Sequence, residues 1–112
     1  MTLLEKQFLF SRSLAALLMR AREINLDVTI GEVWRPPFTA THMASTGAGI
    51  SNSLHCMRLA VDINIFRNGT WLTSNTDFAS LGEFWKSLNP LCSWGGDFGD
   101  GNHFSVTHNG VR

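Results

Sequence analysis

The sequence predicts an α+β domain in which a small antiparallel sheet packs against an N-terminal helix and a second helix. Three observations predict this class: a first segment with helical spacing of apolar residues, short β-branched segments separated by turn residues, and a second helical stripe at 77–88. The predicted order is helix, strand, loop, hairpin, helix, hairpin. With 112 residues, 44% of them apolar, we expect one domain, 1–112, with its own core.

The first helix is expected over about residues 3–24, where apolar residues recur near helical spacing and Lys and Arg occupy the other positions. The segment 24–35 then turns into a strand, because β-branched residues stand at positions 28, 30 and 33. Gly31 within it indicates a bulge or the close approach of another backbone. The pair Pro36-Pro37 ends this strand.

Residues 37–53 are rich in Gly, Ser, Thr and Ala, and we expect a short helix at 38–44 followed by a loop. A loop of this length in a compact domain is usually functional. The stretch "RLAVDINIF" alternates, so it predicts a strand with one buried face and with Asp62 on the other face. The pair Asn68-Gly69 predicts a tight hairpin whose partner strand begins at Trp71.

The helix at 77–88 carries Phe, Leu and Trp on one side, and we expect Asn75, Thr76 or Asp77 to cap it. Pro90 closes it. The stretches "CSW" and "HFSVTH" predict the last two strands, which the glycine-rich loop "GGDFGDGN" connects.

Composition excludes several classes of protein. The formal net charge is zero, which argues against nucleic acid held by bulk electrostatics, and no apolar stretch is long enough to span a membrane. The first twenty residues contain recurrent charges, so a signal peptide is not expected. Two cysteines are too few for a disulfide framework, and we expect both to be reduced. Cys56 follows His55 and could be a metal ligand, although adjacent strand residues point to opposite faces.

Polar side chains gather where predicted strands meet loops: His55, Asp62, Asp97, Asp100 and His103. Two imidazoles and one carboxylate are a ligand set for catalytic zinc, which keeps three protein ligands and one position for water. Residues seven apart on a regular strand lie on opposite faces. The pattern therefore requires a bend at residues 56–58, before the strand that carries the aspartate.

Each of these residues also has an ordinary interpretation. A lone histidine is commonly a satisfied core or surface residue, and Asp97 and Asp100 beside glycines are typical of turns. A carboxylate just before a ligand strand can instead act as general base toward water activated by the metal. His42 could face the substrate, and His108 is expected to be solvated. The residues alone leave both interpretations open.

A resemblance to a known protein family adds to the metal-site interpretation. "SLHCMRLAVDINIF" followed by "WGGDFGDGNHF" resembles the zinc D-alanyl-D-alanine-type peptidases, a family that includes the vancomycin-resistance D,D-dipeptidases, the D,D-carboxypeptidases and many phage endolysins. The family motif is Ser-x-His, six residues, Asp, then a later Asp or Glu, two residues and His, here Ser53, His55, Asp62, Asp100 and His103. "GEVWRPP" resembles the family's strand that ends in a substrate-binding arginine, here Arg35. The resemblance covers roughly residues 28–106 and is strongest for the phage lysis branch.

The resemblance implies a Hedgehog/D,D-peptidase-like fold and one catalytic Zn²⁺ bound by His55, Asp62 and His103. Asp100 would be the general base and then the general acid. Arg35 would hold a substrate carboxylate or stabilise the oxyanion, unless it forms an ordinary strand-end salt bridge. Ser53 would orient the substrate or the first ligand, and Asp97 would brace the loop or a ligand histidine.

The chain departs from the family in three places. Many members have glycine where Arg58 stands, many place a glutamine shortly after the arginine that corresponds to Arg35, and the D,D-dipeptidases use Glu where Asp100 stands. Asp is one methylene shorter, so water must lie closer to this carboxylate. These departures bear on which bond is cleaved.

The function that the resemblance implies is a zinc-dependent peptidoglycan peptidase, either an L-alanyl-D-glutamate endopeptidase or a D-alanyl-D-alanine-type carboxypeptidase. We expect a monomeric phage or prophage endolysin made in the host cytoplasm, which acts on stem peptides after release and has no separate cell-wall-binding domain. The alternatives are a non-catalytic zinc-binding domain of the same fold, as in the Hedgehog signalling domain, and a virion protein that opens the wall during entry.

Overall fold

The computed structural model describes residues 1–45 and 53–112. The helices are α1 (Leu3–Glu23), α2 (Pro37–Ser45) and α3 (Asn75–Leu88), and the short 3-10 turns are η1 (Leu54–Met57) and η2 (Gly95–Phe98). The strands are β1 (Asp27–Ile30), β2 (Ala60–Arg67), β3 (Thr70–Leu72), β4 (Cys92–Trp94) and β5 (His103–Val106). This arrangement of helices and strands confirms the predicted α+β class.

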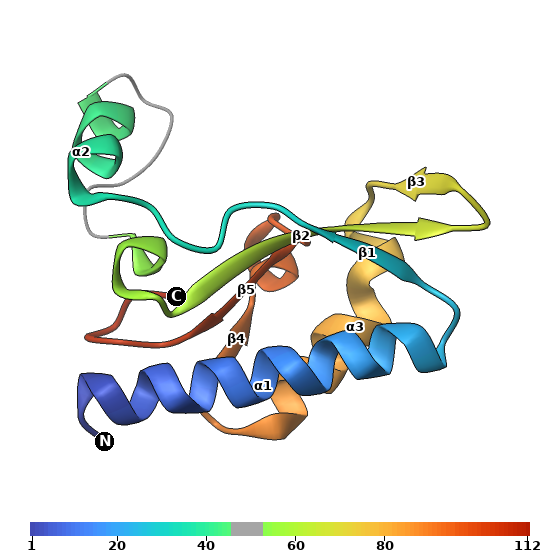
Figure 1. Ribbon diagram of the computed structural model, residues 1–112, viewed down its shortest axis with the longest axis horizontal. Coiled ribbons are helices and arrows are strands. Elements are labelled where there is room, and N and C mark those ends of the chain that lie inside the picture. The colour runs from blue at the N-terminus through green and yellow to red at the C-terminus, as the bar shows by residue number, and fades with distance from the viewer. Residues whose placement is uncertain (46–52) are drawn as a thin grey trace.

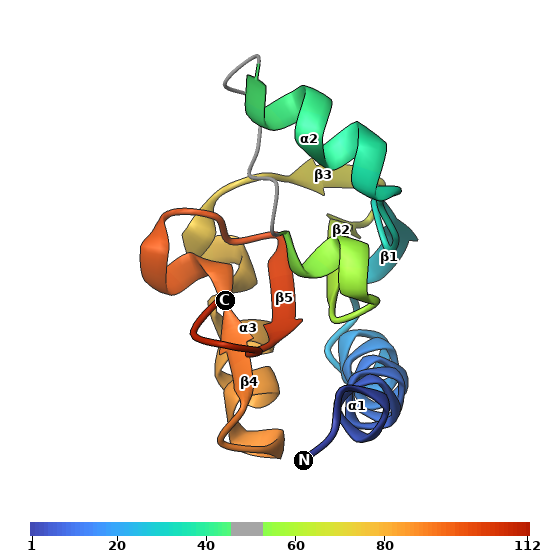
Figure 2. The same cartoon turned by 90° about the vertical axis from the view of Figure 1, so that its left-hand side faces the viewer.

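Strand β2 is the centre of the sheet. It pairs with β1 along one edge, while β5 and β3 pair with successive parts of its other edge, and β4 lies beyond β5. All of these pairs are antiparallel. In the view of Figure 2, α1 lies beneath the strands and α2 stands above them.

The two long helices, α1 and α3, lie on the same side of the sheet (Figure 1), and their buried residues share one core with those of the strands. The predicted alternation of β2 is confirmed, since Val61, Ile63 and Ile65 are fully buried in the core shared with α1 and α3. Asp62 and Asn64, on the opposite face, stay partly exposed. The hydrophobic period of the strand thus leaves its polar side available for a site.

Trp85 of α3 joins three elements in the core. Its ring packs edge-on against Phe104 of β5 at 5.8 Å and against Phe10 of α1 at 6.0 Å between centroids. Its indole N–H donates to the main-chain carbonyl of Ser105 at 2.9 Å, which satisfies the buried polar atom. This contact fixes α3 against the strand that carries His103.

The start of α3 differs from the prediction, because Ser74 is the N-cap and not Asn75, Thr76 or Asp77. The Ser74 hydroxyl accepts from the Asp77 N–H, and the Asp77 carboxylate accepts from the Ser74 N–H, both at 3.1 Å. These bonds with Ser74 lower the pKa of Asp77. Asn75 is used elsewhere: its Oδ1 accepts from the Gly101 N–H at 2.9 Å and ties the helix to the loop before β5.

Two glycines have the roles that the sequence predicts. Asn68 and Gly69 have φ of 50° and 79°, as the two-residue hairpin between β2 and β3 requires. A Cβ at Gly31 would lie 2.8 Å from the carbonyl oxygen of Asp62, and the Gly31 N–H donates to that oxygen at 2.7 Å. The close approach therefore holds the segment after β1 beside Asp62.

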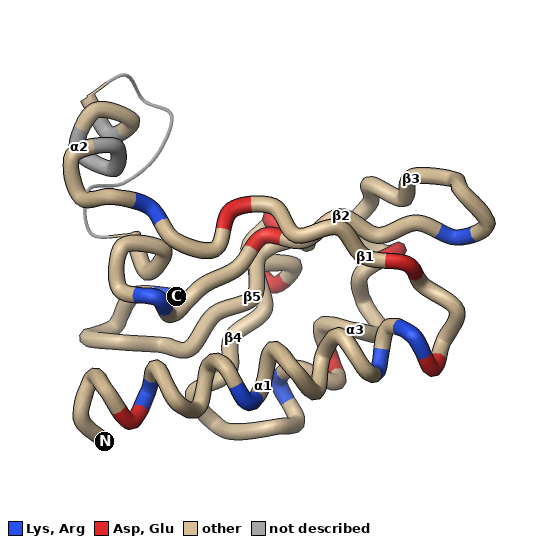
Figure 3. Tube along the Cα trace, viewed as in Figure 1, with Lys and Arg blue, Asp and Glu red and all other residues tan. Residues whose placement is uncertain are grey.

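Positive and negative residues are both distributed along the chain trace (Figure 3). Across the described ranges, no helix combines the length and the apolar character needed to cross a membrane. Cys56 and Cys92 are both free thiols, as expected. Burial raises the pKa of Cys92, which keeps this thiol protonated at neutral pH.

Candidate active site

The three predicted ligand side chains converge. Nε2 of His55 lies 3.4 Å from Oδ1 of Asp62, and Nδ1 of His103 lies 3.3 Å from the same oxygen. One donor atom from each residue lies within 4.8 Å of the other two. Both imidazoles are buried, and the carboxylate is partly exposed. Two nitrogens and one oxygen around a common point fit a single zinc ion with one position left for water.

His55 is placed by the bend that the sequence requires. The Ser53 hydroxyl accepts from the His55 N–H at 3.2 Å, so Ser53 orients this histidine. Arg58 closes the turn with φ 56°, in the left-handed region that favours glycine, and its N–H donates to the carbonyl of Leu54. The guanidinium of Arg58 lies 4.8 Å from the ring centroid of Trp34. This contact helps to hold an arginine in a backbone conformation that favours glycine.

Strand register places the other two side chains. Asp62 on β2 is the direct partner of His103 on β5, so their side chains project from the same face. Gly95 allows the next loop to pack behind them, because a Cβ there would lie 2.1 Å from the carbonyl oxygen of Asp100 and 2.8 Å from Cβ of His103. The first glycine of "WGG" is therefore required by packing.

The charge of Asp62 is stabilised by its partners. Burial raises the pKa of this carboxyl, but hydrogen bonds and charge interactions with His103 and His55 outweigh burial and hold the pKa well below its ordinary value. The carboxylate is consequently ionised at neutral pH, as a metal ligand must be.

These side chains line a cavity of about 450 Å³. Asp100 and Arg35 line the same cavity. The backbone fixes Asp100, whose N–H donates to the carbonyl of Gly95 at 2.8 Å and whose carbonyl accepts from the His103 N–H at 3.0 Å. Its own side chain is exposed to the cavity. A solvent-accessible carboxylate beside the three ligand-type side chains is placed to exchange protons with water.

Arg35 forms the ordinary salt bridge that is one of its two interpretations, because it is buried and its Nη2 donates to Glu32. The predicted strand does not extend to Arg35, however, since β1 ends at Ile30. Its Nε is also buried and makes no hydrogen bond with the part of the chain that the structure describes. The Arg35 N–H donates to the carbonyl of His55 at 3.1 Å, which joins the arginine to the metal-ligand turn.

Sequence analysis missed two residues of the site. Oε1 of Glu32 lies 3.6 Å from Nδ1 of His55 while it accepts from Arg35, so one carboxylate touches both a ligand-type histidine and the arginine. The feature of the sequence that could have identified Glu32 is its position three residues before Arg35, its salt-bridge partner. Arg112 also lines the cavity, and its guanidinium lies 4.5 Å from the ring centroid of Phe98.

Three other predicted residues lie apart from the converging group. Asp97 accepts from Nζ of Lys86 at 3.1 and 3.2 Å, which fits the predicted brace for the loop. His42 is exposed on α2 and is not among the residues that line the cavity. His108 differs from the expected solvated residue, because it is partly buried and its Nδ1 lies 3.0 Å from Nζ of Lys6. Part of the loop at 37–53, residues 46–52, lies outside the described residues.

Replacing Glu32 by glutamine is expected to weaken zinc binding by about 10–100-fold, because groups that support a ligand histidine contribute that much to metal affinity. KM for an anionic substrate should also rise, since a neutral amide holds the Arg35 guanidinium in place less firmly than the carboxylate does. Metal titration and steady-state kinetics measure both effects. The matched control is Glu23→Gln, which removes an exposed carboxylate paired with Arg20. Equal metal affinity in Glu32→Gln and the parent would remove Glu32 from the site.

Comparison with known proteins identifies the family of this chain. A family model described as D-alanyl-D-alanine carboxypeptidase matches residues 46–106, more than half of the chain. The chain belongs to this family. The matched segment contains the three ligand-type side chains and Asp100, while Arg35 and Arg112 lie outside it. Membership in this peptidase family confirms the resemblance that the two motifs indicate.

A solved structure shows the same fold for this member of the D-alanyl-D-alanine carboxypeptidase family. The L-Ala D-Glu endopeptidase ChiX of Serratia marcescens superposes with a TM-score of 0.68 at 20% sequence identity. The alignment covers 92% of this chain and 84% of that one. No curated protein matches the chain.

Proposed function

We propose that this protein is a zinc-dependent peptidase that hydrolyses the L-alanyl-D-glutamate bond of bacterial peptidoglycan stem peptides. The observation that carries the proposal is the convergence of His55, Asp62 and His103 on the wall of one cavity with Asp100 and Arg35. Membership in the D-alanyl-D-alanine carboxypeptidase family supports the reaction class, and the activity named for ChiX supports the choice of bond.

The ligand residues and Asp100 would perform different parts of the reaction. His55, Asp62 and His103 would hold the zinc ion, which when bound supplies a Lewis acid that lowers the pKa of water in the site. The Asp100 carboxylate accepts a proton from the attacking water and then gives it to the leaving amine. The backbone bonds of Asp100 to Gly95 and His103 fix the main chain from which this carboxylate projects.

The two arginines explain why an acidic residue suits this cavity. In the stem peptide, D-glutamate carries a free carboxylate beside the scissile bond. Arg35 offers a buried Nε–H that has no hydrogen-bond partner among the described residues, and Arg112 lines the same cavity. A permanently charged, forked guanidinium binds a carboxylate or a developing oxyanion. A terminal carboxylate could use the same cations, so the carboxypeptidase alternative is decided by the product.

We also propose that the peptidase is a phage or prophage endolysin that is made in the host cytoplasm and reaches the wall through a separate pore protein. The support is the resemblance of "LAVD" and "WGGDF" to the phage lysis branch. A virion protein that opens the wall during entry would use the same chemistry at another time, and localisation of the protein during infection distinguishes the two.

Digestion of purified peptidoglycan tests the proposed reaction. Protein stripped of metal with a chelator should release no peptide, and restored zinc should yield fragments with a new N-terminal D-glutamate by mass spectrometry. Release of free D-alanine would identify a carboxypeptidase instead. Zinc binding with no new product would favour the non-catalytic domain and contradict the proposal.

A further inference from the structure

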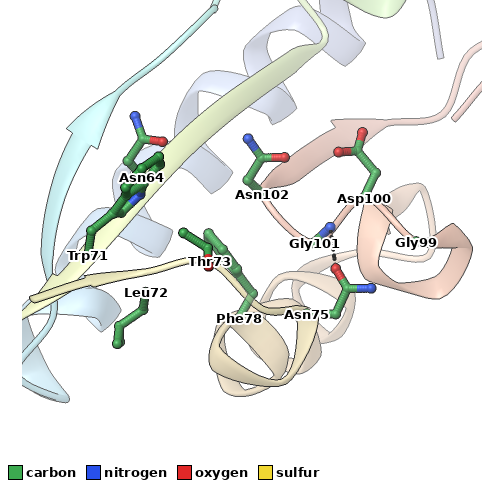
Figure 4. Close-up of a pocket in the computed structure, with 10 residues that line it drawn as sticks. All are labelled: Asn64, Trp71, Leu72, Thr73, Asn75, Phe78, Gly99, Asp100, Gly101 and Asn102. Carbon is green, nitrogen blue, oxygen red and sulfur yellow. Dashed lines mark hydrogen bonds between the residues drawn. The ribbon is translucent and has the colours of Figure 1, made fainter.

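A second cavity lies beside the candidate active site, and none of the residues that line it alone has been assigned a role in the proposed reaction. Its volume is about 260 Å³, and Asp100 belongs to the walls of both cavities. The polar and aromatic side chains around it come from four segments of the chain: Asn64, Trp71, Thr73, Asn75, Phe78, Asp100 and Asn102. Figure 4 shows Asn64 and Trp71 together on one side and Asn75 near Gly101 on the other.

The register of β2 makes this cavity a continuation of the active-site cleft. Asp62 and Asn64 are two residues apart, so they share the open face and lie about 7 Å apart along the strand. Phe66 is the next residue on that face, and its direct partner on β3 is Trp71. The face of β2 therefore leads from the metal ligands to an indole over the length of about four extended residues, roughly 13 Å.

The side chains of this second cavity are polar but almost uncharged. Oδ1 of Asn75 accepts from Gly101, which leaves its amide N–H groups available, and Nδ2 of Asn64 donates to Thr29 at 3.2 Å, which leaves its carbonyl oxygen available. The Asn102 side chain makes no hydrogen bond within the described ranges. Trp71 is 61% exposed. The cavity thus offers amide donors, amide acceptors and one open aromatic face.

We propose that this second cavity binds the N-acetylated amino sugar that carries the stem peptide. The inference rests on the proposed function, because in peptidoglycan the L-alanine is joined directly to the lactyl group of N-acetylmuramic acid. A cut between L-alanine and D-glutamate therefore leaves the sugar one residue from the scissile bond. The second cavity begins at a comparable distance from the metal ligands, because Asn64 follows Asp62 by two residues on the same face of β2.

The chemistry of the sugar fits these walls better than a further length of peptide does. The acetamido and hydroxyl groups pair with carboxamides in both directions, and the C–H face of the pyranose packs on the indole of Trp71. Distal stem residues carry ammonium and carboxylate groups, and Asp100 is the one charged residue among the lining side chains of this cavity. A charged peptide segment would be poorly compensated here.

Two soluble substrates with the same stem peptide test the assignment, one carrying N-acetylmuramic acid on the L-alanine and the other an acetyl group. The parent is expected to prefer the sugar-bearing substrate in kcat/KM. Trp71→Ala should lower kcat/KM for that substrate by about tenfold, the upper range for one aromatic contact, and leave the acetylated substrate unchanged. Trp71→Phe should restore most of the preference. The control Phe8→Ala removes an exposed aromatic from α1, on the other side of the sheet, and should change neither value.

Binding without hydrolysis separates this inference from the proposed function. The indole N–H signal of Trp71, assigned by its loss in Trp71→Phe, should shift when a disaccharide of N-acetylglucosamine and N-acetylmuramic acid is added. A shift in a protein that cleaves neither substrate would support the sugar site and overturn the proposed function. Cleavage of both substrates with equal kcat/KM and no shift would overturn the sugar site and leave the function intact. An equal loss on both substrates in Trp71→Ala would assign the cavity to the peptide.

Discussion

Replacing Asp100 by asparagine is expected to lower kcat on stem-peptide substrates by about 10²–10⁴-fold, the usual contribution of a general acid–base group. Asparagine keeps the shape of the side chain and the backbone bonds to Gly95 and His103, but it cannot accept a proton from water. Zinc affinity should stay unchanged, because Asp100 is not one of the three converging residues. Kinetics and zinc titration on the same preparation measure the two quantities.

The control for this variant is Asp97→Asn, in the same loop. Its carboxylate accepts from Lys86 on α3, so the substitution weakens an exposed ion pair that contributes no more than about 1 kcal/mol. We expect turnover close to that of the parent. Equal turnover in Asp100→Asn and the parent would show that Asp100 is not the base, whereas equal losses in both variants would assign the effect to loop structure.

Replacing Asp62 by asparagine is expected to abolish zinc-dependent activity and to weaken zinc binding by more than about 100-fold, since loss of supporting residues alone costs up to that factor. The substitution removes the one anion of the set, leaves His103 without a charged partner and leaves His55 with Glu32 alone. Metal content after dialysis, measured by mass spectrometry of the ion, reports binding directly. Activity should return only at high added zinc, if at all.

The matched control is Asp27→Asn on the neighbouring strand β1, an exposed carboxylate outside the cavity. It should bind zinc and turn over substrate as the parent does. Urea unfolding of both variants checks that the sheet is intact. If Asp62→Asn retains zinc at the affinity of the parent, the assignment of this ligand is wrong.

Much of the fold and of the ligand set follows from local sequence. The alternation of β2 fixes which residues face the core, and this places Asp62 on the open side. The seven-residue spacing from His55 to Asp62 requires a bend, and the structure confirms it in η1 and in the left-handed Arg58. The pair Asn68-Gly69 likewise determines the hairpin, because both residues adopt positive φ.

The parts that sequence analysis missed depend on contacts between distant segments. Glu32 enters the site because Gly31 bonds the backbone of Asp62, and the pairing partner of that segment is not visible in the local pattern. Arg112 reaches the cavity through its contact with Phe98. The N-cap of α3 is Ser74 and not one of the three predicted residues. Several adjacent polar residues can cap a helix, and their backbone geometry selects one.

The second cavity could not be predicted for a related reason. Asn64, Trp71 and Asn102 belong to three different strands or loops, and each is an ordinary polar or exposed residue in its own segment. Their proximity follows from the pairing of β2 with both β3 and β5 along one edge.

The proposed function depends on one zinc ion held by His55, Asp62 and His103 in the cavity that Asp100 shares. Anomalous diffraction from crystals grown with zinc, recorded on both sides of the zinc absorption edge, locates such an ion. We expect a single strong peak between the three ligand atoms, present in the parent and in Asp100→Asn and absent in Asp62→Asn. A peak at other residues, or no peak between these three in the zinc-soaked parent, would contradict the proposed metal site.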